Sequence, residues 1–160
     1  MILNEIRLLV RKEIQLEWRQ KYAMHGLLLY LASTVFVCYL SFKAKQQAIH
    51  PITWNTLFWI ILLFIAINAI GKSFTQESAQ RNLFYYTIAS PEAIIFSKIA
   101  YNTLVMIGIS LIGIGFYSWV MGNPVGNFPL YLLSLILGAL GFSATLSMIA
   151  GIAAQGENTA

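Results

Sequence analysis

The sequence predicts an all-α membrane protein, a polytopic bundle of transmembrane helices preceded by an amphipathic helix. Apolar residues make up 58% of the 160-residue chain and charged residues only 10%, and the mean hydropathy is +0.70. A soluble domain of this size cannot bury so much apolar surface. Four runs without Asp, Glu, Lys or Arg are long enough to cross the roughly 30 Å hydrocarbon core as helices. These runs comprise residues 24–42, 52–71, 99–121 and 129–154.

Two features are predicted to lie at the membrane interface. The first 23 residues carry apolar side chains at helical spacing opposite charged ones, which favours a helix lying in the interface; a solvated helix before a span is the alternative. The apolar set is Ile2, Ile6, Leu9, Val10 and Leu16, and the charged set is Glu5, Arg7, Arg11, Lys12 and Glu13. Aromatic residues near span ends are expected to be interfacial anchors, namely Tyr22, Trp54, Trp59, Tyr117 and Trp119.

The distribution of Lys and Arg predicts the orientation of the spans. Eight of these residues lie in the leader and in the connection between the second and third spans. Only Lys43 and Lys45 lie in the connection between the first and second spans, and the last connection has none. Because positive charge is retained on the cytoplasmic side, the amino terminus, residues 72–98 and the carboxyl-terminal tail are expected in the cytoplasm.

The connection at residues 72–98 is the most informative. Ser90 and Pro91, followed by a glutamate, are typical of a helix start with Ser90 as N-cap and Pro91 at the first helical position. Upstream, Glu77 and Arg81 are four residues apart in the favourable order for a helix. An apolar and aromatic run follows, comprising Leu83, Phe84, Tyr85 and Tyr86. We expect a short cytoplasmic helix that carries force from a partner into the spans; a loop packed under the bundle is the alternative.

Polar and small residues within the spans predict helix packing. Asn68 and Asn102 are expected to bond to neighbouring helices, because amides in hydrocarbon usually do so, and a role along a substrate path stays open. The fourth span has small residues at three- and four-residue spacing, which permits close approach of helices. One stripe contains Ser134, Gly138, Gly141 and Thr145, and a second contains Ala144, Ser147 and Gly151.

The residue inventory argues against several chemistries. Gly-Lys-Ser at 71–73 matches the end of a phosphate-binding loop, but Ala66 replaces the first glycine and the stretch ends a span. The chain has no Asp, and its six Glu lie outside the spans, so an intramembrane coupling carboxylate is missing. His25 and His50 are expected on opposite sides and cannot share a metal. We predict no catalytic residue and no metal site, and no nucleic-acid binding because the ten Lys and Arg are scattered.

The longest connection and its flanks carry a resemblance to a known family. The main stretch is Lys72-Ser-Phe-Thr-Gln-Glu-Ser-Ala-Gln-Arg-Asn-Leu-Phe-Tyr-Tyr-Thr-Ile-Ala-Ser-Pro-Glu-Ala-Ile-Ile-Phe-Ser-Lys98, followed by Ile-Ala-Tyr-Asn102. It resembles the heme exporter protein B (CcmB) family, the membrane subunit of the ABC transporter of bacterial cytochrome c maturation. The likeness extends to Glu5-Ile-Arg7, Arg11-Lys12-Glu13, Gly122-Asn-Pro-Val-Gly126 and Leu140-Gly-Phe-Ser-Ala-Thr-Leu146. The spacing within 77–98 also recurs, more loosely, in type-2 ABC exporters generally.

The resemblance implies a non-catalytic permease subunit of the inner membrane. ATP would be hydrolysed by a separate cytoplasmic ABC ATPase subunit, and other cytochrome c maturation membrane proteins would be partners besides membrane lipid. Heme would be the transported or handled ligand, delivered for attachment to apocytochrome c. The ATPase-coupling residues would be Glu77, Arg81, Leu83, Phe84, Tyr85, Tyr86, Ser90, Pro91 and Lys98. The family has six spans, so a chain truncated after four of them is expected.

Two other hypotheses remain open. The chain could be the membrane subunit of another type-2 ABC exporter, for lipid, polysaccharide or drug, which would differ in its partners more than in its physics. A membrane-embedded enzyme or a secondary transporter is the other alternative. The absence of Asp and of any acidic residue within the spans counts against it.

Overall fold

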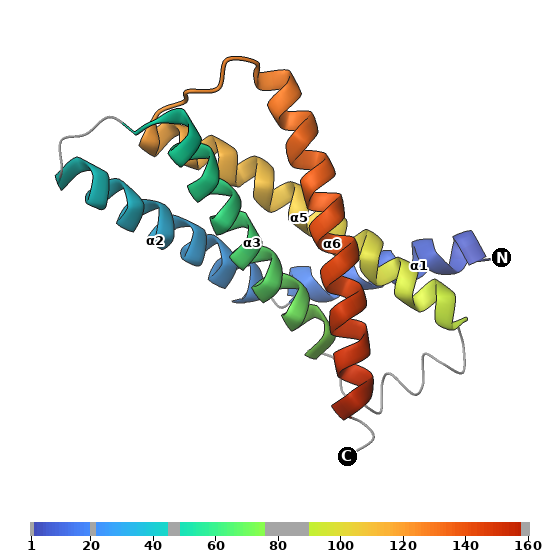
Figure 1. Cartoon of the computed structure of the whole chain (residues 1–160). Coiled ribbons are helices and arrows are strands. Elements are labelled where there is room, and N and C mark those ends of the chain that lie inside the picture. Colours follow the sequence, from blue (N-terminus) through green and yellow to red (C-terminus); the bar gives the residue numbers. More distant parts are fainter. Residues whose placement is uncertain (1, 20–21, 45–48, 76–89, 158–160) are drawn as a thin grey trace.

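The computed structural model describes residues 2–19, 22–44, 49–75 and 90–157, and the regular structure in these ranges is entirely helical. The helices are α1 (Ile2–Arg19), α2 (Tyr22–Ala44), α3 (Pro51–Thr75), α5 (Pro91–Met121) and α6 (Phe128–Glu157) (Figure 1). All except α1 are long and apolar enough to cross a membrane. The prediction of an all-helical protein with four helices that could span a membrane is confirmed.

Local sequence explains where α5 and α6 begin and end. Ser90 is the N-cap of α5, its hydroxyl accepting from the amide of Ala93 at 3.4 Å, and a proline opens the helix. The predicted helix start is therefore confirmed. At the other end, α5 stops at Gly122, whose φ of 79° lies in the region that favours glycine. Asn127 precedes α6 and accepts from the amide of Leu130 at 3.3 Å, a cap that the sequence analysis missed.

The core of the bundle lies among α2, α3, α5 and α6. Figure 1 shows α6 crossing the face formed by α3 and α5, with α2 along the other side of α3. One continuous cluster of buried side chains joins the four helices, including Leu31, Phe58, Ile65, Ile109 and Leu135. Large apolar side chains also cover the outside of the same helices, for example Leu29, Phe36, Leu104, Leu137 and Ile149. This outer surface suits lipid as the solvent.

The face of α6 that packs inward differs from the first stripe predicted for it but includes Ser147 of the second. The buried positions recur every four residues, at Leu135, Ala139, Ser143 and Ser147. In the predicted stripe, Ser134, Gly141 and Thr145 are exposed, and Gly138 alone makes a close contact with another helix. The hydroxyls of Ser134 and Thr145 donate to carbonyls of their own helix, of Leu130 and Gly141 respectively. Because this bonding satisfies them without a neighbour, their polarity does not indicate an interface.

Candidate functional site

Helix α1 runs parallel to the first turns of α5. The Ser90 hydroxyl donates to Oε2 of Glu5 at 3.4 Å, and Nζ of Lys98 lies 4.0 Å from Oε1 of Glu13. In each pair the two residues are 85 positions apart. The two helices therefore keep the same register over eight residues, which is about 12 Å of helical rise. The helix predicted to lie in the membrane interface is thus also a packed part of the bundle.

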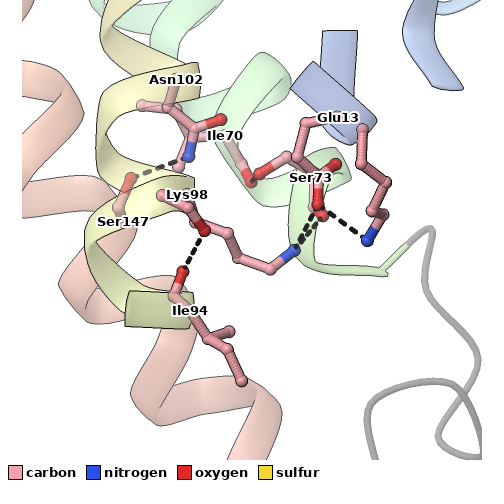
Figure 2. Close-up of polar contacts among 9 residues, drawn as sticks. Glu13, Ile70, Ser73, Ile94, Lys98, Asn102 and Ser147 are labelled. Carbon is pink, nitrogen blue, oxygen red and sulfur yellow. Dashed lines mark hydrogen bonds and ion pairs between the residues drawn. The ribbon is translucent and has the colours of Figure 1, made fainter. Parts of the chain in front are cut away.

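Lys98 is the centre of a contact among three helices, shown in Figure 2. Its ammonium group donates to the main-chain oxygen of Ser73 at 3.2 Å, and it faces Glu13, which also pairs with Lys12 at 3.2 Å. Ser73 belongs to α3, Glu13 to α1 and Lys98 to α5. We call this set of three residues, Glu13, Ser73 and Lys98, the Lys98 junction.

Within the Lys98 junction, the buried ammonium group has both a carboxylate partner and a carbonyl acceptor. The side chains of Lys98 and Glu13 are only 10% and 14% exposed, and a charge so buried needs a partner of opposite sign or hydrogen bonds. The Ser73 carbonyl is among the last four of α3, which have no amide partner within the helix. A lysine at this helix end supplies the missing donor and complements the negative end of the helix dipole. Lys98 therefore stabilises the end of α3 as well as pairing with α1.

Helix α6 attaches to α5 close to the Lys98 junction. Nδ2 of Asn102 donates to the Ser147 hydroxyl at 2.8 Å (Figure 2), and both side chains are buried. The Ser143 hydroxyl donates to the main-chain oxygen of Ile99 at 3.0 Å. Asn102 thus makes the predicted interhelical bond, and its partner helix is α6. The same end of the bundle therefore joins α1, α3, α5 and α6 through polar groups.

The opposite end of the bundle is joined by aromatic rings. The rings of Trp54, Phe58, Tyr117 and Tyr131 come from α3, α5 and α6, and Trp54 and Phe58 each lie against the other three rings, with centroids 4.8 to 6.4 Å apart. We call these four residues the aromatic cluster. Nε1 of Trp54 donates to the Gly122 carbonyl at 2.9 Å, and the Tyr117 hydroxyl donates to the Trp54 carbonyl at 3.1 Å. The turn after α5 is thereby fixed to the start of α3.

The aromatic cluster corrects part of the interfacial-anchor prediction. Trp54 is 1% exposed and Tyr117 is fully buried, so both are core residues whose polar atoms bond within the bundle. Trp59 is half-buried and lies against Gly138 of α6. Trp119 is 81% exposed, as an anchor would be. The side chain of Tyr22 lies outside the described residues.

The predicted ATPase-coupling residues divide into two groups. Six of them lie outside the described part of the chain, namely Glu77, Arg81, Leu83, Phe84, Tyr85 and Tyr86. The other three, Ser90, Pro91 and Lys98, lie in or next to the first turns of α5, where two of them contact α1.

Two of the predicted packing residues are placed outside the interhelical contacts. Asn68 is exposed, and its amide donates to the carbonyl of Phe64 in its own helix at 2.8 Å. An added Cβ at Gly141 would meet nothing within 4 Å, so this glycine does not mark a close approach between the described helices. Sequence reasoning missed Glu13 and Ser73. The equal spacing of eight residues between Glu5 and Glu13 and between Ser90 and Lys98 was the one available signal.

No protein-family model, no curated protein and no solved structure matches this chain. Within residues 2–19, 22–44, 49–75 and 90–157, no group of three or more His, Cys, Asp or Glu side chains is placed to hold a metal ion.

Proposed function

We propose that the chain is the non-catalytic membrane subunit of an ABC transporter, and that a separate ATPase acts on the connection between α3 and α5. The observation that supports this most is the Lys98 junction. It ties the end of α3 to the start of α5, the two helices that the connection joins. A displacement of the connection would then move both spans together, whereas a loosely attached loop would absorb it.

The contrast between the two ends of the bundle supports a mechanism. The aromatic cluster joins α3, α5 and α6 by packed rings, of which those of Trp54, Phe58 and Tyr117 are buried and that of Tyr131 is partly buried. At the other end, the Lys98–Ser73 hydrogen bond holds α3 to α5, and helix α1 is joined to Lys98 through the ion pair with Glu13 at 4.0 Å. We infer that α3 and α5 move together about the aromatic cluster while the contact between α1 and Lys98 rearranges, a rigid-body change of packed elements.

The resemblance to the CcmB family favours one branch of ABC transporters. In that branch the chain would serve cytochrome c maturation in the bacterial inner membrane, with heme as the handled ligand and with heme-handling membrane proteins as further partners. The excess of Lys and Arg in the leader and in residues 72–98 supports a cytoplasmic Lys98 end. The ATPase would dock there, on residues 77–88.

Co-purification tests the proposed partnership. The tagged chain would be solubilised from a host that makes cytochrome c and probed for a bound ATPase, beside a version with residues 77–88 scrambled. The matched control changes Asn123→Ala in the exposed turn at the opposite end. We expect the intact chain and N123A to retain the ATPase and the scrambled chain to lose it at equal membrane insertion. Equal recovery by all three, or by none, would contradict docking at this connection.

A second experiment tests coupling and the heme branch. Glu77→Lys and Gln80→Pro are expected to preserve insertion but to uncouple ATP hydrolysis from cytochrome c maturation. Adding heme to the purified complex should change its absorption spectrum if the chain belongs to the heme branch. ATPase recovery without a spectral change would indicate another type-2 ABC exporter. Normal maturation in both variants would count against force transfer through this connection.

A further inference from the structure

Among residues 5–16 of α1, whose side chains the structure describes, the outward face carries positive charge without matching negative charge. Glu5 and Glu13 both turn toward α5, where they meet Ser90 and Lys98. The remaining charged side chains described on this helix include Arg7 and Arg11, which are exposed and one helical turn apart. Neither guanidinium group makes a hydrogen bond or ion pair with another described residue. Within residues 5–16, the packing of α1 thus separates the two glutamates from the two arginines.

Apolar side chains share this outward face. Leu8 is 66% exposed and Ile14 is 43% exposed. At 3.6 residues per turn, these two residues, Arg7, Arg11 and Gln15 fall within an arc of about 120°. We call these five residues the α1 outward face. This face thus combines two exposed apolar side chains with two exposed arginines.

The register between α1 and α5 shows beside which residues of α5 the α1 outward face lies. The same separation of 85 positions places Arg7 level with Glu92 and Arg11 level with Phe96. The apolar stretch of α5 begins at Glu92, and Ile95 and Phe96 are exposed there. Helix α1 is also followed, after residues 20–21 alone, by the apolar helix α2. The α1 outward face therefore lies where the hydrocarbon of a membrane would begin.

We propose that the α1 outward face binds anionic phospholipid. The guanidinium groups of Arg7 and Arg11 fit phosphate oxygens of the headgroups, to which arginine donates in a planar fork. Leu8 and Ile14 reach the boundary with the acyl chains, as in amphipathic helices that bind anionic membranes. An acidic partner protein would match the charge but would leave unexplained why this face lies level with the apolar start of α5. The proposal does not depend on the transporter assignment.

Lipid-selective quenching in nanodiscs tests the proposal on the full chain. A fluorophore would be attached at Gln15→Cys in a Cys38→Ser background, because Cys38 is the only cysteine. Nanodiscs would contain phosphatidylglycerol and phosphatidylcholine at one fixed ratio, with either lipid brominated in turn. We expect brominated phosphatidylglycerol to quench more per mole than brominated phosphatidylcholine, with about fivefold enrichment per arginine at low salt and less at high salt.

Three variants complete the test. Arg7→Gln with Arg11→Gln should make quenching by the two lipids equal, whereas Arg7→Lys with Arg11→Lys should keep most of the difference. Lys43→Gln removes an exposed cation at the opposite end of α2 and should change nothing. Far-UV circular dichroism establishes that each variant is folded.

Equal quenching by both lipids in the parent overturns the proposal, and so does a preference that survives R7Q/R11Q. If the two lipids quench the parent equally and R7Q/R11Q no longer co-purifies with the ATPase, the proposal is overturned in favour of a protein partner.

Discussion

Nζ of Lys98 lies 3.2 Å from the main-chain oxygen of Ser73, and these two residues stand on either side of the connection between α3 and α5. Their hydrogen bond holds the two attachment points of that connection at one separation. If a partner docks on this connection, as proposed, less of the binding energy is spent on ordering the ends of the connection.

Removing the Lys98 ammonium group is predicted to destabilise the bundle. Lys98→Met keeps most of the apolar stem but leaves the Ser73 carbonyl without this donor and Glu13 without this cation. We expect the free energy of unfolding to fall by about 1–3 kcal/mol, since buried polar groups lose their partners. Titration with sodium dodecyl sulfate in mixed micelles, followed by far-UV circular dichroism, measures the change. Lys43→Met is the matched control at the opposite end, and an equal effect in both variants would disprove a special role for Lys98.

The pairing of Glu13 with Lys98 is predicted to appear as non-additivity. In a double-mutant cycle of Glu13→Gln and Lys98→Met, the double variant should lose less stability than the sum of the single variants. We expect a coupling energy of about 0.5–2 kcal/mol, because the two groups are mostly buried and 4.0 Å apart. A parallel cycle uses Glu92→Gln in place of Glu13→Gln, because Glu92 is an exposed residue of α5. The losses of stability in this cycle should be additive. Additivity in the first cycle would show that the ion pair does not link α1 to α5.

Local signals in the sequence were sufficient for the helices and for one cap. Apolar runs identified all four candidate spans because each run is continuous. The cap of α5 was predictable because Ser90, Pro91 and the amide of Ala93 that bonds to Ser90 lie within four residues of sequence. The Glu13–Lys98 pair joins residues 85 positions apart, and periodicity shows that a face is polar without showing its partner.

The rotation of each span was the part that sequence could not supply. A helix that is apolar all round has no periodic face, so nothing local distinguishes its lipid side from its core side. Trp54 and Trp119 both lie near span ends, yet the first is buried and the second is exposed. Gly138 and Gly141 belong to one stripe of small residues, but Gly138 alone meets a neighbouring helix. In each case tertiary packing decides the role.

The Tyr117 hydroxyl is predicted to stabilise the aromatic end of the bundle. Tyr117→Phe keeps the ring in the aromatic cluster but removes the hydrogen bond to the buried Trp54 carbonyl. We expect a loss of about 0.5–1.5 kcal/mol in the free energy of unfolding, measured by the same titration. Tyr30→Phe is the matched control, because this tyrosine is exposed on α2. A result for Y117F no larger than for Y30F would argue against a structural hydrogen bond at this end.

Gly138 is predicted to be intolerant of a single methyl group. A Cβ at this position would overlap two ring carbons of Trp59, which packs edge-on against Phe142 of α6 with centroids 6.1 Å apart. Gly138→Ala must therefore displace the indole or separate α3 from α6, and we expect a cost of about 1–3 kcal/mol in unfolding free energy.

Gly141 supplies the matched control for Gly138, since it lies in the same helix and an added Cβ there meets open space. Gly141→Ala should be neutral or slightly stabilising, because alanine favours the helix more than glycine does. If overlap with the indole is the cause, Trp59→Phe should recover part of the loss in the Gly138→Ala background, since phenylalanine is the smaller ring. Equal stability of G138A and G141A would show that α3 and α6 do not approach as closely as the Gly138–Trp59 contact requires.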